Sequence, residues 1–262
     1  LVVARKLDRE QQSEYRLEIR ALDTSSSNNP QSSAITVKVE IADVNDNAPQ
    51  WSTDPLIFSV NEAALVGAVI YNFTATDADT GTNGDLQYKL LRYGPMEENE
   101  TAKFSVDALT GALSLQAPLD RETTEEYTLI VQALDQSSNI TERLQTTVTA
   151  LLRVTDANDN APEFVSPPQS MPQQQQYTSH IYIGDGTRIG EQIAHLLALD
   201  RDSGLNARLT YDILSGNEEQ RFKLNAQTGI LELIKMLPAR LAAGEQNDLP
   251  AFNLVIRASD QG

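Results

Sequence analysis

The sequence predicts an all-β protein built from sandwich units in tandem. Three observations lead to this prediction: apolar residues alternate with a period of two in several stretches, no long helical pattern interrupts them, and the same phrases return after about 110 residues. Because a strand with one apolar face needs a second sheet to cover it, the economical arrangement is an antiparallel sandwich.

The middle of the chain contains about seven predicted strands, separated by turn residues such as Thr110-Gly111. The longest alternation covers residues 144–154 and puts every second side chain on one face. The other strands are predicted at residues 57–60, 69–75, 86–90, 104–106, 113–115 and 127–133.

Three phrases recur in a fixed order along the chain. LDRE at residues 7–10 returns at 119–122, DVNDNAP at 43–49 returns as DANDNAP at 156–162, and DADTGTN at 77–83 returns as DRDSGLN at 200–206. The chain is therefore interpreted as an internal fragment of a repeat protein. It comprises the C-terminal part of one repeat (1–48), a complete repeat (49–161) and a third repeat that lacks its last strand (162–262).

The net charge of −17, from 37 acidic and 20 basic residues, argues against nucleic acid and against anionic membrane surfaces as partners. Most of the excess acid lies in the repeated phrases at the unit boundaries. Neighbouring carboxylates repel one another, so such clusters persist where a cation neutralises them. Oxygen ligands without cysteine or histidine indicate calcium, whereas magnesium prefers fewer protein ligands and more water.

A self-contained EF-hand loop is the first alternative for these ligands. Asp156, Asn158 and Asn160 do occupy positions 1, 3 and 5 of such a loop. However, Ala161 stands where the loop needs glycine, and Pro167 stands where it needs a bidentate glutamate. We therefore expect the ligands to come from several segments of two adjoining units.

Taken together, the DxNDNAP, LDRE and DxD phrases and the AxD strand ending resemble the extracellular repeats of cadherins. The resemblance covers nearly all of the chain and implies tandem seven-stranded Greek-key β-sandwich repeats joined by calcium-binding linkers. It also implies about three calcium ions at each complete junction between repeats. The looser phrases and the irregular third repeat are most similar to the long atypical arrays of the Fat, Dachsous or protocadherin type.

The resemblance carries a set of calcium ligands over to each junction, position by position. The first junction takes Asp8, Glu10, Asp43, Asn45, Asp46, Asn47, Asp77, Asp79, Asn83 and Asp135. The second takes Glu62, Asp120, Glu122, Asp156, Asn158, Asp159, Asn160, Asp200, Asp202, Asn206 and Asp260. In the second, Asp159 is expected to bridge two ions, Asn158 to offer its side-chain oxygen, and Asn160 and Asn206 their main-chain carbonyls.

The third repeat departs from this pattern in three places. Asp185 replaces the early glutamate, no DRE phrase follows Pro238, and a short helix is expected at 241–245. A Pro/Gln-rich insertion at 166–176 is expected to form an exposed loop, either a tolerated insertion or a site for a partner.

Three Asn-x-Ser/Thr triplets, which begin at Asn72, Asn99 and Asn139, are candidate glycosylation sites if the chain is secreted. The prediction places Asn72 on the outer face of its strand, between Tyr71 and Phe73. The absence of cysteine is neutral on location, because oxidising compartments permit disulfides without requiring them.

No catalytic constellation is expected. The two histidines, His180 and His195, accompany no nucleophile motif, and the loop at 184–190 lacks the βαβ context of a phosphate site. A metal-dependent hydrolase is disfavoured because ions saturated by protein oxygens leave no position for substrate. Trp51 is expected to have a packing role.

The function implied by the resemblance is calcium-dependent cell–cell adhesion by the rigidified ectodomain of a single-pass membrane glycoprotein. This ectodomain would lie on the extracellular side of the plasma membrane, and its partner would be another cadherin ectodomain, bound homophilically or heterophilically. The alternative is a heterophilic receptor or signalling ectodomain in which adhesion is secondary.

Overall fold

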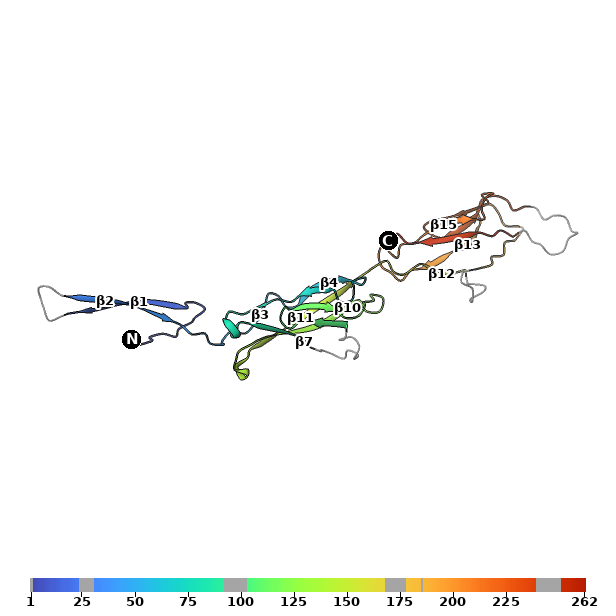
Figure 1. Ribbon diagram of the computed structural model, residues 1–262. Coiled ribbons are helices and arrows are strands. Elements are labelled where there is room, and N and C mark those ends of the chain that lie inside the picture. Colours follow the sequence, from blue (N-terminus) through green and yellow to red (C-terminus); the bar gives the residue numbers. More distant parts are fainter. Residues whose placement is uncertain (1, 24–30, 92–102, 168–177, 185, 239–250) are drawn as a thin grey trace. The chain divides into compact units, whose positions relative to one another are not determined.

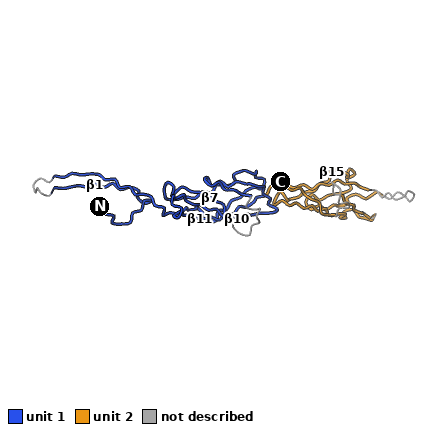
Figure 2. The backbone as a smooth tube through the Cα atoms, turned by 60° about the horizontal axis from the view of Figure 1, so that its bottom comes forward, with its two compact units in different colours: residues 1–155 blue, residues 156–262 orange. Residues whose placement is uncertain are grey.

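The computed structural model describes residues 2–23, 31–91, 103–167, 178–184, 186–238 and 251–262. Two compact units divide the chain, residues 1–155 and 156–262, which are coloured separately in Figure 2. Strands dominate the described parts of both units, so the predicted all-β class is confirmed. Within those parts, no helix is long and apolar enough to cross a membrane. The predicted repeat boundaries after residues 48 and 161 stay predictions.

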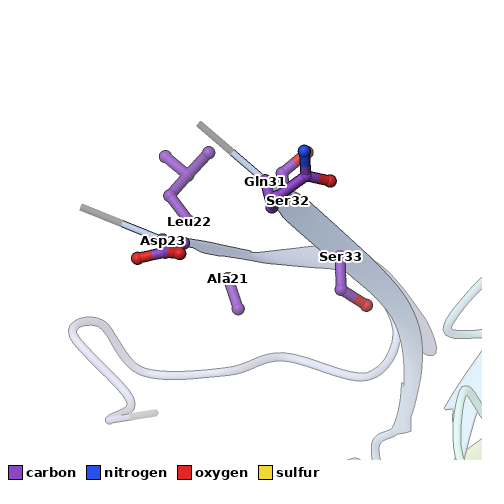
Figure 3. A pocket seen from close by; sticks show the side chains of 6 residues that line it. All are labelled: Ala21, Leu22, Asp23, Gln31, Ser32 and Ser33. Carbon is purple, nitrogen blue, oxygen red and sulfur yellow. The ribbon is translucent and has the colours of Figure 1, made fainter. Parts of the chain in front are cut away.

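The first unit opens with an antiparallel hairpin of two long strands, β1 (Glu14–Leu22) and β2 (Ser32–Glu40) (Figure 1). Leu17 lies opposite Val37, and apolar residues at every second position on both sides of this pair share one face. Figure 3 shows a pocket at the end of the hairpin where β1 finishes and β2 begins. It is lined by Ala21, Leu22, Asp23, Gln31, Ser32 and Ser33.

The rest of the first unit is a strand-rich sandwich, which also carries two short 3-10 turns, η1 (Gly81–Asn83) and η3 (Ile140–Glu142). Its strands are β3 (Gln50–Trp51), β4 (Leu56–Asn61), β5 (Val69–Asn72), β6 (Ala75–Thr76), β7 (Leu86–Leu91), β8 (Phe104–Val106), β9 (Ala112–Leu115), β10 (Glu126–Asp135) and β11 (Gln145–Thr155).

Two main sheets enclose the core of this sandwich. One has the strand order β4-β11-β10-β7 and the other β5-β9-β8, and the short pair β3-β6 stands beside them. Alternate residues of the long strands point inward because successive side chains in a strand face opposite sides. The fully or nearly fully buried side chains include Phe73, Leu113, Leu115, Tyr127, Val131, Val148 and Leu152.

The structure differs from the predicted strands at the start of the sandwich. The stretch predicted as one strand at 69–75 is split into β5 and β6, which belong to different sheets, and buried Phe73 lies between them. Strand β3 was not predicted, since two residues are too few to show a period. Strand β4 pairs parallel with β11, which departs from the expected antiparallel arrangement. The reason is that the chain crosses from one sheet to the other between β3 and β4.

The second unit repeats this plan with fewer strands in its described residues. They are β12 (Glu163–Ser166), β13 (Gln192–His195), β14 (Leu197–Leu199), β15 (Thr210–Ser215), β16 (Phe222–Leu224), β17 (Ile230–Leu233) and β18 (Val255–Ser259). Their pairings are β12-β14, β13-β17-β16 and β15-β18, and the core contains buried Phe222, Leu231 and Leu233. Residues 168–176 of the insertion predicted at 166–176, Asp185, the helix expected at 241–245 and the triplet at Asn99 lie outside the described residues.

Substitution of two glycines in tight turns of the sandwich tests how closely each turn is packed. Gly111 and Gly67 both have positive φ angles, 71° and 88°, which disfavour any side chain. A Cβ on Gly111 would also meet the carbonyl oxygen of Phe73 at 2.3 Å, whereas a Cβ on Gly67 meets nothing within 4 Å. We expect Gly67→Ala to lower the free energy of unfolding by about 1–2 kcal/mol and Gly111→Ala by about 3 kcal/mol or more. Urea unfolding in excess calcium measures both, and equal losses would contradict the close packing at Gly111.

Candidate metal centre

The ligands predicted for the first junction come from four segments of the first unit. They lie in the turn before β1, in the link between β2 and β3, in the loop between β6 and β7 that contains η1, and at the end of β10. Each segment begins or ends at a strand, so the sandwich fixes where its carboxylates point. The structure brings most of these side chains together, as the following contacts show.

Three carboxylates from three of these segments form the centre of the cluster. Oxygens of Glu10, Asp46 and Asp79 all lie within 4.8 Å of one another, and only 6% of Asp79 is exposed. Like charges at this separation repel strongly when one of them is shielded from water. The arrangement therefore needs a positive charge between them.

Two asparagines lock the carboxylates in place through their side-chain nitrogens. Asn47 Nδ2 donates to Asp79 Oδ1 at 2.7 Å and to Asp46 Oδ1 at 3.0 Å. Asn83 Nδ2 donates to Asp43 Oδ2 at 2.9 Å. These amides act as donors toward the acids, so their remaining contribution to a cation site is a carbonyl oxygen.

Asn45 likewise donates through its side-chain nitrogen, and its side-chain oxygen is buried. Its Nδ2 donates to Asp135 Oδ2 at 3.0 Å and to the Glu142 carbonyl oxygen at 2.7 Å. Asp135 is fully buried and also accepts backbone N–H bonds from Ser137 at 3.0 Å and Leu144 at 2.6 Å. The anchored nitrogen leaves Asn45 Oδ1 buried and without a hydrogen-bond partner among the described residues.

Two more buried oxygens share this condition, Asp43 Oδ1 and Asp77 Oδ2. Within the described part of the chain neither accepts a hydrogen bond, although the guanidinium of Arg9 lies 3.2 Å from Asp43 Oδ1. Burial raises the pKa of Asp77, and the nearby charges of Asp79 and Asp135 raise it further. Leaving such oxygens unpaired is costly, and a cation that ligates them removes the cost.

The chemistry of this donor set fits calcium. Every candidate ligand is a carboxylate, amide or carbonyl oxygen, and the chain contains no cysteine. Calcium takes six to eight such oxygens in flexible geometry, which suits ligands gathered from several loops.

Not every predicted ligand is tied into the network. Both carboxylate oxygens of Asp8 accept from Gln11, at 3.0 Å from its backbone nitrogen and 2.8 Å from Nε2, and these are the bonds that the described structure shows for the Asp8 side chain. Sequence reasoning also missed Arg9, which pairs with Glu10 and donates to Thr80 Oγ1 at 2.6 Å. The repeated LDRE phrase was the signal for Arg9, since the arginine recurs together with the acids.

The first unit carries a second acidic cluster, in the loop after β4 and in the loop between β9 and β10. Its acids are among the ligands predicted for the second junction. Carboxylate oxygens of Glu62, Asp120 and Glu122 lie within 4.8 Å of one another. Glu62 is 5% exposed and accepts from the Arg121 backbone nitrogen at 2.6 Å. Asp120 accepts from Thr123, both from its backbone nitrogen and from its hydroxyl.

The second unit repeats the hydrogen-bond pattern of the first junction. Asn206 Nδ2 donates to Asp156 Oδ2 at 2.8 Å, as Asn83 does to Asp43. Asn160 Nδ2 donates to Asp202 Oδ1 at 2.7 Å and to Asp159 Oδ1 at 2.8 Å, as Asn47 does to Asp79 and Asp46.

Two further details recur in the second unit. Asp200 Oδ2 is buried and lacks a hydrogen-bond partner in the described structure, like its counterpart in Asp77. Asn158 Nδ2 donates to Asp260 Oδ1 at 2.9 Å, and this bond, together with the backbone N–H of Gly262, lowers the pKa of Asp260. The same side-chain roles therefore appear twice in the chain.

A family model described as the Cadherin domain matches residues 57–155 and 179–262. The chain belongs to the cadherin family. Cadherin domains bind calcium in general, which agrees with the carboxylate clusters of the first unit.

Curated relatives place this cadherin chain among large proteins. It is 62% identical to Protein dachsous of Drosophila melanogaster, over 100% of the chain and 7% of that protein. It is 33% identical to Protocadherin Fat 1 of Homo sapiens, over 98% of the chain and 5% of that protein. The chain thus spans a small fraction of each relative, and the predicted likeness to long atypical arrays is confirmed.

A solved cadherin structure supports the fold. The cis-dimer structure of protocadherin gammaB7 EC3-6 superposes with a TM-score of 0.82 at 29% identity, over 98% of this chain and 57% of that one. The seven-stranded Greek-key sandwich expected from the resemblance is the fold of these repeats.

Substitutions of two acids of the first junction can distinguish a structural role from a role as a calcium ligand. Asp135 is fully buried and satisfies three donors, so we expect Asp135→Ala to lower the free energy of unfolding by about 3 kcal/mol in chelator, where no ion is bound. Asp46 is exposed, so Asp46→Ala should change stability in chelator by less than about 0.5 kcal/mol and act only when calcium is present. Urea midpoints in both buffers measure this, and a loss in chelator for Asp46→Ala would contradict its assignment as a ligand.

Proposed function

We propose that the chain is part of a calcium-rigidified ectodomain that acts in cell–cell adhesion, on the extracellular side of the plasma membrane. The parent protein is a single-pass membrane glycoprotein and not an enzyme. The observation that carries the proposal is the recurrence of one arrangement in both units. In each, carboxylates are held by asparagine side chains while a buried aspartate oxygen, in Asp77 and in Asp200, lacks a hydrogen-bond partner in the described structure.

The predicted ligand sets, with about three ions at each junction, remain part of this proposal. In the first junction, Glu10, Asp46 and Asp79 supply the central carboxylates, and Asn45 and Asp77 present their unpartnered oxygens. In the second, the matching acids of the DANDNAP and DRDSGLN phrases act in the same way. Asp159, the counterpart of Asp46, would be shared between two ions.

The mechanism follows from charge balance. Calcium supplies positive charge between carboxylates that otherwise repel one another. Carboxylates and amides from three or four loops would then bind the same ions, so these loops could no longer move apart. Extracellular calcium modules bind at about 10⁻⁴–10⁻³ M, so the junctions are filled outside cells and empty inside them.

The partner is another cadherin ectodomain. The solved protocadherin gammaB7 structure is described as a cis-dimer, and this supports contact between cadherin ectodomains as the mode of action. A heterophilic receptor or signalling ectodomain, with adhesion secondary, is the second candidate, and the similarity to Dachsous and Fat proteins is compatible with it.

Removal of one bridging acid tests the calcium junctions. We expect Asp46→Ala and Asp159→Ala each to weaken calcium binding about tenfold or more, equivalent to about 1.4 kcal/mol, because two ions lose a shared ligand. Isothermal titration measures the affinity, and small-angle scattering with and without calcium measures the stiffening. Glu126→Ala is the control, since it removes an acid that pairs with Arg153 on the sandwich strands. An affinity unchanged in both aspartate variants would remove the bridging role.

Bead aggregation with the full ectodomain tests the adhesive role. Beads coated with the single protein should clump in millimolar calcium and disperse in chelator if adhesion is homophilic. Clumping that needs a second, differently coated bead assigns the heterophilic receptor function. Failure to clump with any cadherin coat, with calcium binding intact, would contradict adhesion while leaving the metal centre in place.

A further inference from the structure

The connection between β10 and β11 combines a glycosylation triplet with a structural role in the metal centre. It contains the triplet Asn139-Ile140-Thr141, of which all three residues are exposed, and η3 starts within it. Asn139 is the N-cap of η3. The connection belongs entirely to the first unit and to its described residues.

The side-chain amide of Asn139 has a defined orientation. Its Oδ1 accepts from the Thr141 backbone nitrogen at 3.2 Å and from the Thr141 hydroxyl at 2.8 Å. Its Nδ2 takes part in none of the hydrogen bonds of the described structure. The oxygen is therefore turned toward the chain, and the nitrogen, which is the atom that carries an N-linked sugar, is left accessible.

The same turn supports the calcium centre. Glu142 ends η3, and its carbonyl oxygen accepts from Asn45 Nδ2 at 2.7 Å. This bond helps to aim Asn45 Oδ1, one of the unpartnered buried oxygens. Arg143 steadies the connection by donating from Nε to the Ser137 carbonyl oxygen at 2.9 Å.

We propose that Asn139 carries an N-linked glycan on the outer side of the turn that orients Asn45, and that this glycan and bound calcium coexist. Because the sugar is attached to Nδ2, both hydrogen bonds to Oδ1 are kept and the cap of η3 survives. Calcium affinity is then independent of the glycan but dependent on the cap. The inference rests on the extracellular location in the proposed function.

The sugar donor for this modification is a lipid-pyrophosphate oligosaccharide. A bond forms between Asn139 Nδ2 and the anomeric carbon of the first sugar. The bond from that carbon to the pyrophosphate oxygen breaks, and the lipid pyrophosphate leaves with the electron pair. The proton displaced from Nδ2 is taken up by a base.

Ile140→Pro removes the acceptor while keeping both residues of the cap, because proline at the middle position of a triplet blocks glycosylation. The turn accommodates proline: Asn139 has φ −87° and ψ 103°, in the extended region preferred before proline, and the first position of a helical turn tolerates it. Ile140→Ala is the matched control, since it removes the same side chain, which is 75% exposed, and preserves the triplet. Asn139→Ala removes the glycan and the cap together.

The test expresses the full chain behind a secretory leader in eukaryotic cells and measures two quantities. Site-resolved glycopeptide mass spectrometry should find residue 139 modified in the original chain and in Ile140→Ala, and unmodified in Ile140→Pro. Calcium titration should give affinities within about twofold for these three proteins and a several-fold loss for Asn139→Ala.

An unmodified Asn139 in the secreted chain would overturn the inference while leaving the calcium centre standing. A several-fold change of affinity in Ile140→Pro, but not in Ile140→Ala, would overturn the coexistence of glycan and ion. A glycosylated chain that binds no calcium would instead refute the proposed function and leave the modification site intact.

Discussion

The structure depends on carboxylates that are held close together, with Asp79 buried among them, and without enough positive charge to balance them. Asparagine side chains fix them: Asn47 holds Asp79, and Asn83 holds Asp43. An amide can orient a carboxylate, but it cannot cancel its charge. The orientation therefore concentrates repulsion instead of relieving it, and Asp79, which is almost fully buried, cannot rely on water for screening. Only a cation satisfies both the charge and the unpartnered oxygens.

The sandwich supplies the rigidity that makes this arrangement possible. The loops that bear the acids begin or end at strands whose inner faces are packed, such as β10, where Tyr127 and Val131 are buried. A close-packed core resists deformation, so the loops cannot relax far enough to separate their charges. The plan that the two units share then produces the same arrangement of acids twice, with Asn206 and Asp156 in the places of Asn83 and Asp43.

Much of this arrangement was predictable because short stretches of the sequence determine it. The long alternations that became β10 and β11 and the repeated acidic phrases need no knowledge of the rest of the fold. The split of the 69–75 stretch into β5 and β6 was not predictable, because both halves have the same period and only the tertiary structure assigns them to different sheets. The different hydrogen-bond partners of Asn45 and Asn47 were likewise not predictable from the DVNDN phrase alone. They include Asp135 and Asp79, which are far away in the sequence.

Arg9 reduces the repulsion among the acids of the first junction. Its guanidinium lies 3.2 Å from Asp43 Oδ1 and from Glu10 Oε1, which cancels part of the repulsion among the acids of the first junction. Arg121 stands beside Glu122 and Glu125 in the next copy of the phrase. With one arginine among several carboxylates, the cluster keeps a net negative charge that a divalent ion can neutralise. This net negative charge is smaller than that of the acids alone. A reduced net negative charge weakens the attraction for calcium, which agrees with the modest affinity of about 10⁻⁴–10⁻³ M typical of extracellular modules. In the proposed calcium junctions, the arginine of the LDRE phrase would therefore lower the affinity for calcium while it reduces repulsion among the neighbouring acids.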